Sequence, residues 1–424
     1  MIARRITLFA LAVLAAASWA ISSSAQHKQH MGVAPATLTF PEGKDVVEIP
    51  FEFERNKILI PVRVNGSEPI SFILDTGAPI AVLLGSAYLE SLDVDIIGEA
   101  QIAGAGGDAP VSVPVAGDVT FDINGIQITN GTMAMGVGEG KLAHFGTTGV
   151  IGLPVFKNCV VEFDFQKHIL RLYRPEAYTY SGHGMELPLR FSRHGSFPYV
   201  TTEVSIDGGA PVPASMVIDT GAGLALSLDV DSDDDLHMPG NTVSSIMGWG
   251  ASGAIRGHTG RITSLSLGDY VLENVIANIP DAGDMHAITS SEAPDDVVRN
   301  GLIGVKVLKR FHVVFDYTNA RIILEPNSDF SDPFTYNTTG LVPMPWAQHA
   351  ESLEVADVIG GSPAKMAGIE IGDRVTAIDG QPVAAIGADA IQKVLEQAPG
   401  TSVTFTIRRG DEKLEKVLVL GKLI

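Results

Sequence analysis

The stretch FILDTGA occupies residues 72–78 of the chain, and it returns as MVIDTGA at residues 216–222. Each copy is followed by a second shared block, GVIG at residues 149–152 and GLIG at residues 301–304. The same two blocks in the same order are the signature of a duplicated unit. The sequence therefore predicts two related lobes, each with one Asp at the end of an apolar run.

Both lobes have the residue pattern of β-sheet domains. The 424-residue chain contains 45 Gly and 24 Pro spread along its length, which favours many short strands over long helices. The apolar runs at residues 58–64 and 199–206 end in Asn-Gly and Asp-Gly, the strongest short signals of a β-hairpin. We expect a mainly β body of two lobes, residues 49–178 and 185–326, related by a pseudo-twofold axis.

A third module follows the lobes. Residues 327–339 contain Pro and Asp and are predicted to be a linker, and the pattern changes from residue 340 onward. We expect a β/α module at residues 340–424. Its predicted elements are a short helix opened by Ser362-Pro363, a strand at residues 374–378, a helix at residues 388–397, and a hairpin formed by residues 402–408 and 413–420.

The first 25 residues have the pattern of a secretory signal peptide. Arg4 and Arg5 precede an apolar run at residues 6–21, and small residues stand before the expected cleavage point. We therefore expect an exported protein, periplasmic or secreted, with residues 26–48 as an N-terminal tail. The alternative is an uncleaved anchor, because the run is only slightly shorter than a spanning helix. No later stretch is long and apolar enough to span a membrane.

The charge balance and the single cysteine limit the partners. The chain has 29 basic and 49 acidic residues, a net charge of −20, which disfavours nucleic acid and anionic lipid surfaces. Cys159 lies in an apolar strand pattern and is predicted to be a buried small residue rather than a nucleophile. The acidic run at residues 231–235 lacks the spaced Gly and final Glu of a calcium loop, so a solvated turn is favoured. We expect no metal and no cofactor.

Asp75 and Asp219 form a candidate catalytic pair. Hydrolysis of a peptide bond by two carboxyl groups requires both to reach one water, with one ionised as general base and the other protonated to polarise the carbonyl. Like charges a few ångströms apart do not both ionise, so such a pair shares a proton and titrates as a unit. Two copies of one Asp-bearing loop around a pseudo-twofold axis supply this geometry.

The residues after each Asp have predicted supporting roles. Glycine two residues after the Asp permits the tight turn that brings backbone N–H groups toward the carboxylate. The threonine hydroxyls are able to hydrogen-bond across the axis and hold the two loops in register. The predicted supporting residues are Thr76, Gly77, Ala78, Thr220, Gly221 and Ala222.

These motifs resemble those of the aspartic peptidase superfamily, in particular bacterial relatives of the retropepsin-type proteases fused in tandem. The family signature is an apolar-apolar-Asp-Thr-Gly loop and a later apolar-apolar-Gly turn that packs beneath it. Both lobes carry both parts, with the supporting turns at residues 150–152 and 302–304. The resemblance covers residues 49–326 and implies an aspartic endopeptidase, a hydrolase, for which one chain supplies both halves of the site and a monomer suffices.

Members of this family close a glycine-rich hairpin flap over the substrate, and each lobe has a candidate for it. Glycine suits a mobile lid whose backbone approaches a peptide closely. The alternative is that these stretches are only surface turns. The predicted flap residues are Gly104, Ala105, Gly106 and Gly107 in the first lobe, and Gly248, Trp249 and Gly250 in the second.

The chain departs from the Ser- and Thr-containing forms of the signature because Ala78 and Ala222 follow the glycines. An alanine offers no hydroxyl donor to the outer carboxylate oxygen. Because a donor stabilises the ionised form, we expect a pair of carboxyl groups that is less acidic than in those forms, and activity that extends toward neutral pH.

The C-terminal module resembles a PDZ domain of the kind associated with bacterial proteases, through the stretches at residues 358–368 and 371–380. Such modules hold a peptide as an added strand. The predicted groove strand begins at Gly340, Leu341 and Val342, but Pro343 and Pro345 lack N–H donors there. A regulatory or substrate-presenting role is therefore as consistent with the sequence as capture of C-terminal peptides.

Two functions from different classes follow. The first is an exported aspartic endopeptidase that cuts extended peptides or unfolded proteins. The second is a catalytically inactive peptide-binding or scaffold protein of the same fold. The two intact Asp-Thr-Gly loops favour the first, because a protein without catalysis has no chemical need for either loop.

Overall fold

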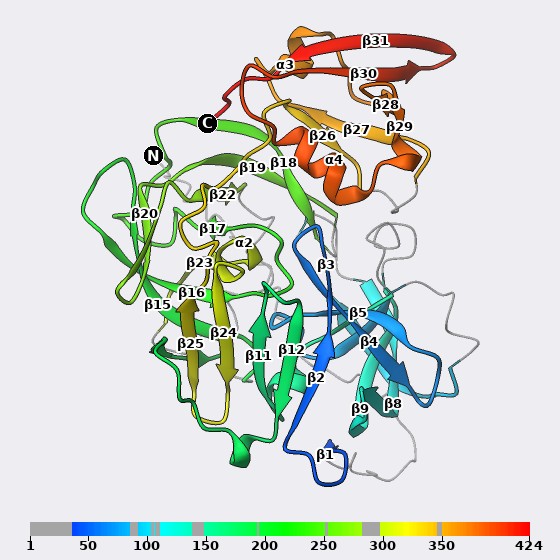
Figure 1. Ribbon diagram of the computed structural model, residues 1–424, viewed down its shortest axis with the longest axis vertical. Helices are drawn as coiled ribbons and strands as arrows, with labels where there is room; N and C mark the ends of the chain where they lie inside the picture. Colours follow the sequence, from blue (N-terminus) through cyan, green and yellow to red (C-terminus); the bar gives the residue numbers. More distant parts are fainter. Residues whose placement is uncertain are drawn as a thin grey trace, which may run out of the picture.

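The computed structural model describes residues 36–84, 92–102, 106, 111–137, 148–192, 195–250, 253–281, 297–345 and 350–424. This part of the chain forms four β-sheets and only short helices, which confirms the predicted fold class. Figure 1 shows the first lobe in blue to cyan, the second in green to yellow, and the C-terminal module in orange to red at one end of the long axis.

The first lobe is built on a nine-stranded sheet in which the strand that leads to Asp75 is central. That strand, β5, pairs antiparallel with β4 on one side and parallel with β10 on the other. In spatial order the sheet contains β1 (Thr37–Thr39), β9 (Ile126–Val137), β6 (Ala81–Leu84), β10 (Gly149–Ile151), β5 (Ile70–Leu74), β4 (Lys57–Val64), β8 (Val111–Ile123) and β7 (Asp95–Ile102), with β3 (Glu52–Glu54) paired to β4.

The second lobe repeats this arrangement in a ten-stranded sheet. Here β16 leads to Asp219, and it pairs antiparallel with β15 and parallel with β23. In spatial order the sheet contains β18 (Thr242–Gly250), β19 (Gly253–Arg261), β22 (Ile276–Pro280), β17 (Leu226–Leu228), β23 (Arg299–Ile303), β16 (Val212–Ile218), β15 (Pro198–Ser205), β20 (Ser264–Leu267) and β21 (Tyr270–Glu273), with β14 (Arg190–Phe191) paired to β15.

A six-stranded sheet joins the two lobes. Strands β11 of the first lobe and β24 of the second pair antiparallel, with Glu162 opposite Val314. Behind this pair, Phe163 and Phe315 make an edge-to-face contact at 5.9 Å between ring centroids, so the lobes share one core. In spatial order the sheet contains β13 (Met185–Pro188), β25 (Arg321–Pro326), β24 (Phe311–Asp316), β11 (Val160–Asp164), β12 (Ile169–Tyr173) and β2 (Val46–Pro50).

The two hairpins that lead into the central strands confirm the turn prediction. Asn65 and Gly66 have φ of 47° and 76°, and Asp207 and Gly208 have φ of 49° and 75°. Two successive residues with left-handed backbone suit the right-handed twist of a hairpin, and Asn, Asp and Gly adopt this conformation at the lowest cost. These turns fix the register in which each Asp-bearing strand enters its sheet.

The helices of the lobes are single turns placed directly after the supporting glycines. Gly152 is the N-cap residue of α1 (Leu153–Phe156), and Gly304 is the N-cap residue of α2 (Val305–Leu308). A 3-10 turn, η2 (Pro175–Ala177), begins the connection from the first lobe to the second.

The C-terminal module has its own core and its own sheet, centred on Phe405. As predicted, Ser362 caps the first helix, since its hydroxyl accepts a hydrogen bond from the Lys365 N–H at 3.3 Å. The sheet contains β26 (Leu341–Pro343), β27 (Leu353–Val358), β28 (Arg374–Ile378), β30 (Ser402–Arg409) and β31 (Glu412–Val419), with β29 (Gln381–Pro382) paired to β28. The helices are α3 (Pro363–Met366), η3 (Val383–Ala385) and α4 (Ala388–Leu395).

Helix α4 is two residues shorter than predicted. The Thr338 N–H donates to the Leu395 carbonyl at 2.8 Å, and its hydroxyl donates to the Gln397 carbonyl at 2.8 Å. The carbonyls at the end of the helix are therefore satisfied by a segment from outside it, and the helix does not need to continue. The sequence pattern alone does not show this contact.

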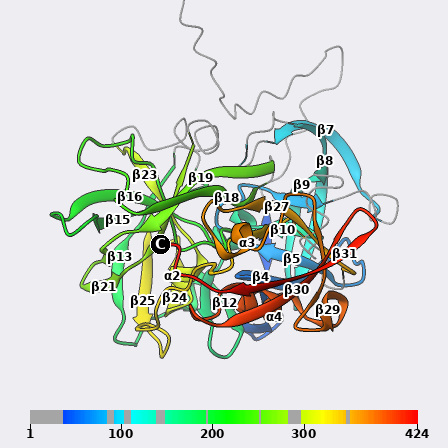
Figure 2. The ribbon, with the colours of Figure 1, turned by 90° about the horizontal axis from the view of Figure 1, so that it is seen from above.

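The connection between the second lobe and the C-terminal module is packed against the second lobe. The Arg310 guanidinium donates to the carbonyls of Asp329, Phe330 and Asp332 at 2.5–3.1 Å, and it lies over the Phe334 ring at 3.8 Å. Seen from above in Figure 2, the module lies over the middle of the molecule, above both lobes. Because Arg310 fixes the connection to the second lobe, the connection limits the positions that the module is able to take.

Candidate active site

The two candidate catalytic residues occupy equivalent positions at the ends of β5 and β16. The Asp75 N–H donates to the Ile151 carbonyl at 2.9 Å, and the Asp219 N–H donates to the Ile303 carbonyl at 2.9 Å. Each Asp-bearing loop is thus fixed by the parallel strand that carries the second shared block of its own lobe. Both carboxyl side chains are partly buried.

Beneath the carboxyl groups, the two loops are tied together by four hydrogen bonds. The Thr76 N–H donates to Thr220 Oγ1 at 2.9 Å, and the Thr220 N–H donates to Thr76 Oγ1 at 3.0 Å. Each hydroxyl in turn donates to a carbonyl of the opposite lobe, Thr76 to Ile218 at 2.6 Å and Thr220 to Leu74 at 2.8 Å. Both threonines are fully buried, so this network sets the distance between the two loops.

Glycine after each Asp-Thr pair is required by two contacts. Its N–H donates to the carboxylate of its own loop, Gly77 to Asp75 Oδ1 at 2.7 Å and Gly221 to Asp219 Oδ1 at 2.8 Å. The Cα of Gly221 also faces the opposite lobe, where an added Cβ would lie 2.2 Å from Asp75 Cγ. A side chain at this position would push the two carboxyl groups apart.

The supporting glycines lie directly below the loops. A Cβ on Gly152 would lie 1.9 Å from the Asp75 carbonyl oxygen, and one on Gly304 would lie 2.4 Å from the Leu224 carbonyl oxygen. Only glycine permits the second block to approach this closely, which gives the repeated apolar-apolar-Gly turn its physical role.

The two carboxyl groups are close enough to interact strongly. Burial and the neighbouring negative charge of Asp219 raise the pKa of Asp75 to about 8, and a hydrogen bond to Asp219 adds to the rise. The hydrogen bond from Gly77 and the charge of Lys57 oppose it. A pKa raised in this way favours the protonated form of Asp75 at neutral pH.

The alanines after the glycines give the two loops different hydrogen bonds. The Ala222 N–H lies 3.0 Å from Asp219 Oδ1, so the Asp219 carboxylate accepts from two backbone groups. Each alanine N–H also donates to the backbone carbonyl of its own Asp, Ala78 to Asp75 at 3.1 Å and Ala222 to Asp219 at 3.3 Å, so the contact with the carboxylate oxygen is what distinguishes Ala222. Two loops of the same sequence thus present different donor sets to their carboxyl groups.

Lys57 of the first lobe contacts the Asp219 loop of the second lobe, and no sequence pattern predicted this role. It begins β4 after a turn at Arg55 and Asn56, both with left-handed backbone, φ 49° and 56°. Its ammonium donates a hydrogen bond to the Gly221 carbonyl. Burial lowers the pKa of Lys57, and the charges of Asp219 and Asp75 oppose this change. No local motif marks this lysine, since its partner is 164 positions away along the chain.

The candidate flaps are only partly within the described residues. Gly248, Trp249 and Gly250 lie at the end of the β18–β19 hairpin, with an irregularity in the register between Ile246 and Gly248. In the first lobe Gly106 is described, with φ of 118°, whereas Gly104, Ala105 and Gly107 lie outside the described residues. The use of either hairpin as a flap stays a prediction.

In the C-terminal module, Leu341 and Val342 form an edge strand, β26, next to β27. The amide donors in front of this edge are already engaged by the chain itself. Asn337 Oδ1 accepts from the N–H groups of Thr339 at 3.0 Å and Gly340 at 2.9 Å, and Thr339 Oγ1 accepts from the Leu341 N–H at 3.0 Å.

The Leu341 carbonyl accepts a hydrogen bond from Asn337 Nδ2 at 2.8 Å. From the sequence, only Pro343 and Pro345 are expected to hinder peptide capture at β26. The side chain of Asn337 is a second cause, because its Oδ1 already accepts from the Thr339 and Gly340 N–H groups, the donors that a peptide carboxylate would need.

The module contacts both lobes through its acidic side chains. Asp357 Oδ2 on β27 accepts from the Ile246 N–H at 3.0 Å, on the strand that leads to Gly248, and lies 3.4 Å from the Arg256 guanidinium of β19. Asp389 on α4 accepts from the Arg55 N–H at 3.0 Å, in the turn that carries Lys57. The module is thus attached to the β18–β19 hairpin and to the turn beside the two aspartates.

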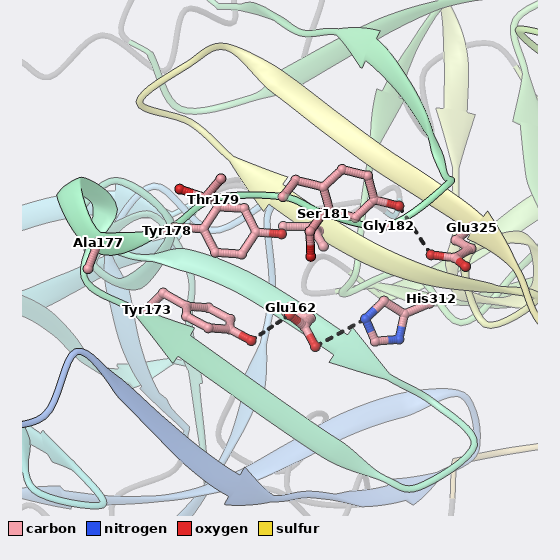
Figure 3. A pocket seen from close by; sticks show the side chains of 11 residues that line it. Glu162, Tyr173, Ala177, Tyr178, Thr179, Ser181, Gly182, His312 and Glu325 are labelled. Atoms are coloured by element: carbon pink, nitrogen blue, oxygen red, sulfur yellow. Dashed lines mark hydrogen bonds and ion pairs between the residues drawn. The ribbon is translucent and has the colours of Figure 1, made fainter.

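A separate cavity of about 330 Å³ lies on the six-stranded sheet (Figure 3). Its lining includes Glu162, Tyr173 and His312, but neither Asp75 nor Asp219. Burial acts to raise the pKa of Glu162, but hydrogen bonds from His312, Tyr173 and Arg171 outweigh it and bring the pKa to about 2. A carboxylate that is fully ionised and held by three donors stabilises the junction of the lobes and is not poised for proton transfer.

Within the ranges that the structure describes, no group of three or more His, Cys, Asp or Glu side chains is placed to hold a metal ion. Cys159 is buried, and burial raises the pKa of its thiol to about 12, as suits a small core residue.

The fold and the paired Asp loops define a two-lobed protein of the aspartyl protease type. Comparison with family profiles agrees: the aspartyl protease family matches residues 60–155 and 202–307, and the PDZ domain matches residues 354–409. Each aspartyl protease segment includes one Asp-Thr-Gly loop and the supporting Gly turn of the same lobe. The chain is therefore similar to aspartyl proteases in a segment of each lobe and to PDZ domains in its C-terminal module. A search of curated proteins finds no match to the chain.

Proposed function

We propose that the chain is an aspartic-type endopeptidase in which Asp75 and Asp219 activate one water molecule. The observation that carries the proposal is the geometry of the pair: both carboxyl groups are partly buried, and a Cβ on Gly77 would lie 3.0 Å from Asp75 Oδ1 and 3.4 Å from Asp219 Oδ1. The raised pKa of Asp75 supports it. The ionised carboxylate takes a proton from water as the water oxygen attacks the peptide carbonyl carbon, and the protonated one gives its proton to the carbonyl oxygen. The tetrahedral intermediate then collapses: the C–N bond breaks as the leaving nitrogen takes the proton that the first carboxylate received from water, and the re-forming carbonyl returns its proton to the other carboxylate.

The substrate class follows from the architecture. A site between two β lobes suits a peptide in extended conformation, which pairs with strand edges through its backbone. Gly248 and Gly250 leave room for the backbone of the β18–β19 hairpin to approach such a peptide closely. We propose extended peptides and unfolded segments of proteins as substrates, with one chain sufficient for catalysis.

The test is hydrolysis of a denatured protein by the chain that begins at residue 26, from acidic to mildly alkaline pH, with and without a statine-type inhibitor. Fragments that disappear with the inhibitor and with the Asp75→Asn variant support the proposal. Asp231→Asn is a matched control, since Asp231 lies in an acidic turn of the second lobe. Peptide binding by the wild-type chain with no cleavage at any pH would instead favour the inactive peptide-binding protein.

We propose that the PDZ module regulates the protease through the β18–β19 hairpin. Two observations favour this over capture of C-terminal peptides: the Asn337 side chain satisfies the groups in front of β26, and Asp357 holds the hairpin strand. Asp357→Asn should change kcat/KM for peptide substrates, while a peptide with a free C-terminus should bind no more tightly than its amidated form. Tighter binding of the free carboxylate would contradict this role.

We also propose export by removal of residues 1–25. Its support is the sequence pattern alone, since the structure describes the chain from residue 36 onward. None of the helices in the described part has the length and apolar character needed for a membrane span. Sequencing the N-terminus of protein recovered from outside the cytoplasm should give a start near Gln26, whereas an intact Met1 would favour the anchor.

A further inference from the structure

The symmetry of the site is broken by Lys57. Strand register identifies its counterpart: Leu59 pairs with Ile73 and Tyr199 pairs with Val217, and Ile73 and Val217 each lie two residues before an Asp. Lys57, two residues before Leu59, therefore corresponds to residue 197 in the second lobe. That residue is Phe197, a buried apolar side chain. The two-lobed site has a cation on one side and a phenyl ring on the other.

The cation acts on one peptide unit of the Asp219 loop. The ammonium of Lys57 binds the Gly221 carbonyl, and the N–H of the same peptide unit, carried by Ala222, lies 3.0 Å from Asp219 Oδ1. The peptide dipole therefore has its negative end toward a cation and its positive end toward a carboxylate. Polarisation along such a chain strengthens each hydrogen bond in it.

We infer that Lys57 is a positioning residue that polarises the Gly221–Ala222 peptide and so fixes Asp219 as the ionised carboxylate and Asp75 as the proton carrier. This assignment of roles rests on the proposed protease function. Asp219 is then the general base that takes the proton of water, and Asp75 gives its proton to the substrate carbonyl. The raised pKa of Asp75 agrees with the second role.

The turn that carries Lys57 contacts the PDZ module, the second lobe and the Asp219 loop. These contacts fix the position of the Lys57 ammonium beside the Gly221 carbonyl. The Arg55 N–H is bound by Asp389 of the PDZ module at 3.0 Å. Asn56 Oδ1 lies 3.5 Å from Lys309 Nζ of the second lobe. A Cβ on Gly223 would lie 3.2 Å from the Arg55 carbonyl oxygen, so the turn is seated directly on the Asp219 loop.

Other ionisable groups face the pair from the neighbouring elements. Arg55 lies on the same turn as Lys57, and its charge acts on that lysine. Arg299 of β23 donates to the Gly301 carbonyl at 3.3 Å; burial lowers its pKa, and the charges of Tyr199, Asp219 and Asp229 oppose this change. Tyr317, after β24, is affected by the charge of Asp75, and burial raises its pKa well above the usual value, so it stays neutral. Among these groups, Lys57 is the cation that contacts the Gly221–Ala222 peptide unit, whose N–H donates to the Asp219 carboxylate.

The test compares Lys57→Gln, which keeps an N–H donor but loses the charge, with Lys57→Arg, which keeps the charge. The acidic limb of the pH profile of kcat/KM should move upward by about one pH unit in Lys57→Gln, because the carboxylate loses a nearby cation. Lys57→Arg should restore the wild-type limb, and Lys44→Gln, a change on an exposed turn, should leave it in place.

A second measurement follows the ionisation of the Asp75–Asp219 pair directly, without substrate turnover. With [13C]-labelled Asp carboxyl groups, an NMR titration should show the first ionisation of the pair about one pH unit higher in Lys57→Gln than in the wild type. The inference would be overturned if a folded Lys57→Gln protein had the same acidic limb of kcat/KM and the same carboxyl titration as the wild type. The inference would also be overturned if Lys57→Gln were more active than the wild type with the same acidic limb, because the lysine would then be blocking the cleft. Absence of hydrolysis by the wild-type chain would refute the protease proposal, while the titration would still decide the role of Lys57.

Discussion

The threonine network beneath the aspartates leads to a quantitative prediction for Thr220→Val. Valine has nearly the shape of threonine but lacks Oγ1, so the change leaves the Thr76 N–H and the Leu74 carbonyl without the partners they have at 2.9 and 2.8 Å. Each unpaired buried group costs about 1–3 kcal/mol, so the free energy of unfolding should fall by about 2–6 kcal/mol. This is a large share of the stability of a typical domain.

Two matched variants separate the hydrogen bonds from packing. Thr220→Ser keeps the hydroxyl and loses one methyl group, with an expected cost of about 1 kcal/mol. Thr201→Val changes an exposed threonine on β15 and should stay within about 0.5 kcal/mol of the wild type. Urea unfolding gives all three values. A Thr220→Val protein that unfolds within about 0.5 kcal/mol of the wild type would refute the idea that this network joins the lobes.

Three further predictions follow from the packing and the protonation of the site. Gly152→Ala should abolish activity and lower the melting temperature, because its Cβ would lie 1.9 Å from a carbonyl oxygen, whereas Gly98→Ala, with open space around it, should change neither. Arg310→Met should destabilise the body in calorimetry by more than Arg374→Met, since Arg310 satisfies four carbonyls and Arg374 forms an exposed ion pair; equal losses would contradict this. The folded-state pKa of Asp75, about 8, lies above its unfolded value, so the stabilisation from its proton is complete below about pH 4 and is lost as the pH rises through about 8. Wild-type stability should therefore fall relative to Asp75→Asn over this range, and parallel stability curves would contradict it.

The sequence was sufficient to predict the fold class, because the determining signals are local. The hairpins at Asn65-Gly66 and Asp207-Gly208 depend on backbone preferences of the residues themselves, and both are present. The duplicated Asp loops indicated two related lobes, and the family comparison matches one aspartyl protease segment to each of the two repeats. Strand register and the shared six-stranded sheet were not predictable, because pairing between β11 and β24 depends on residues far apart in the chain.

The parts of the site that the sequence did not reveal are contacts between lobes and between modules. Lys57 follows an ordinary turn, and its role depends on a carbonyl supplied by the other lobe. Asp357 lies on a mostly apolar strand and Asn337 in a polar turn, and neither position indicates a role in the sequence. Their roles depend on the docking of the PDZ module and on the conformation of one loop. Side chains that act across an interface leave no periodic pattern in one sequence, so a structure is needed to find them.

The most direct test of the shared-water mechanism is the kcat/KM of Asp75→Asn, Asp219→Asn and the double variant on one peptide substrate. Two carboxyl groups that act on a single water should be inseparable: each single variant should lose at least about 10³-fold, and the double variant should be no worse than either. A single Asn variant that keeps activity within about tenfold of the wild type would contradict the mechanism, since one carboxyl group would then suffice.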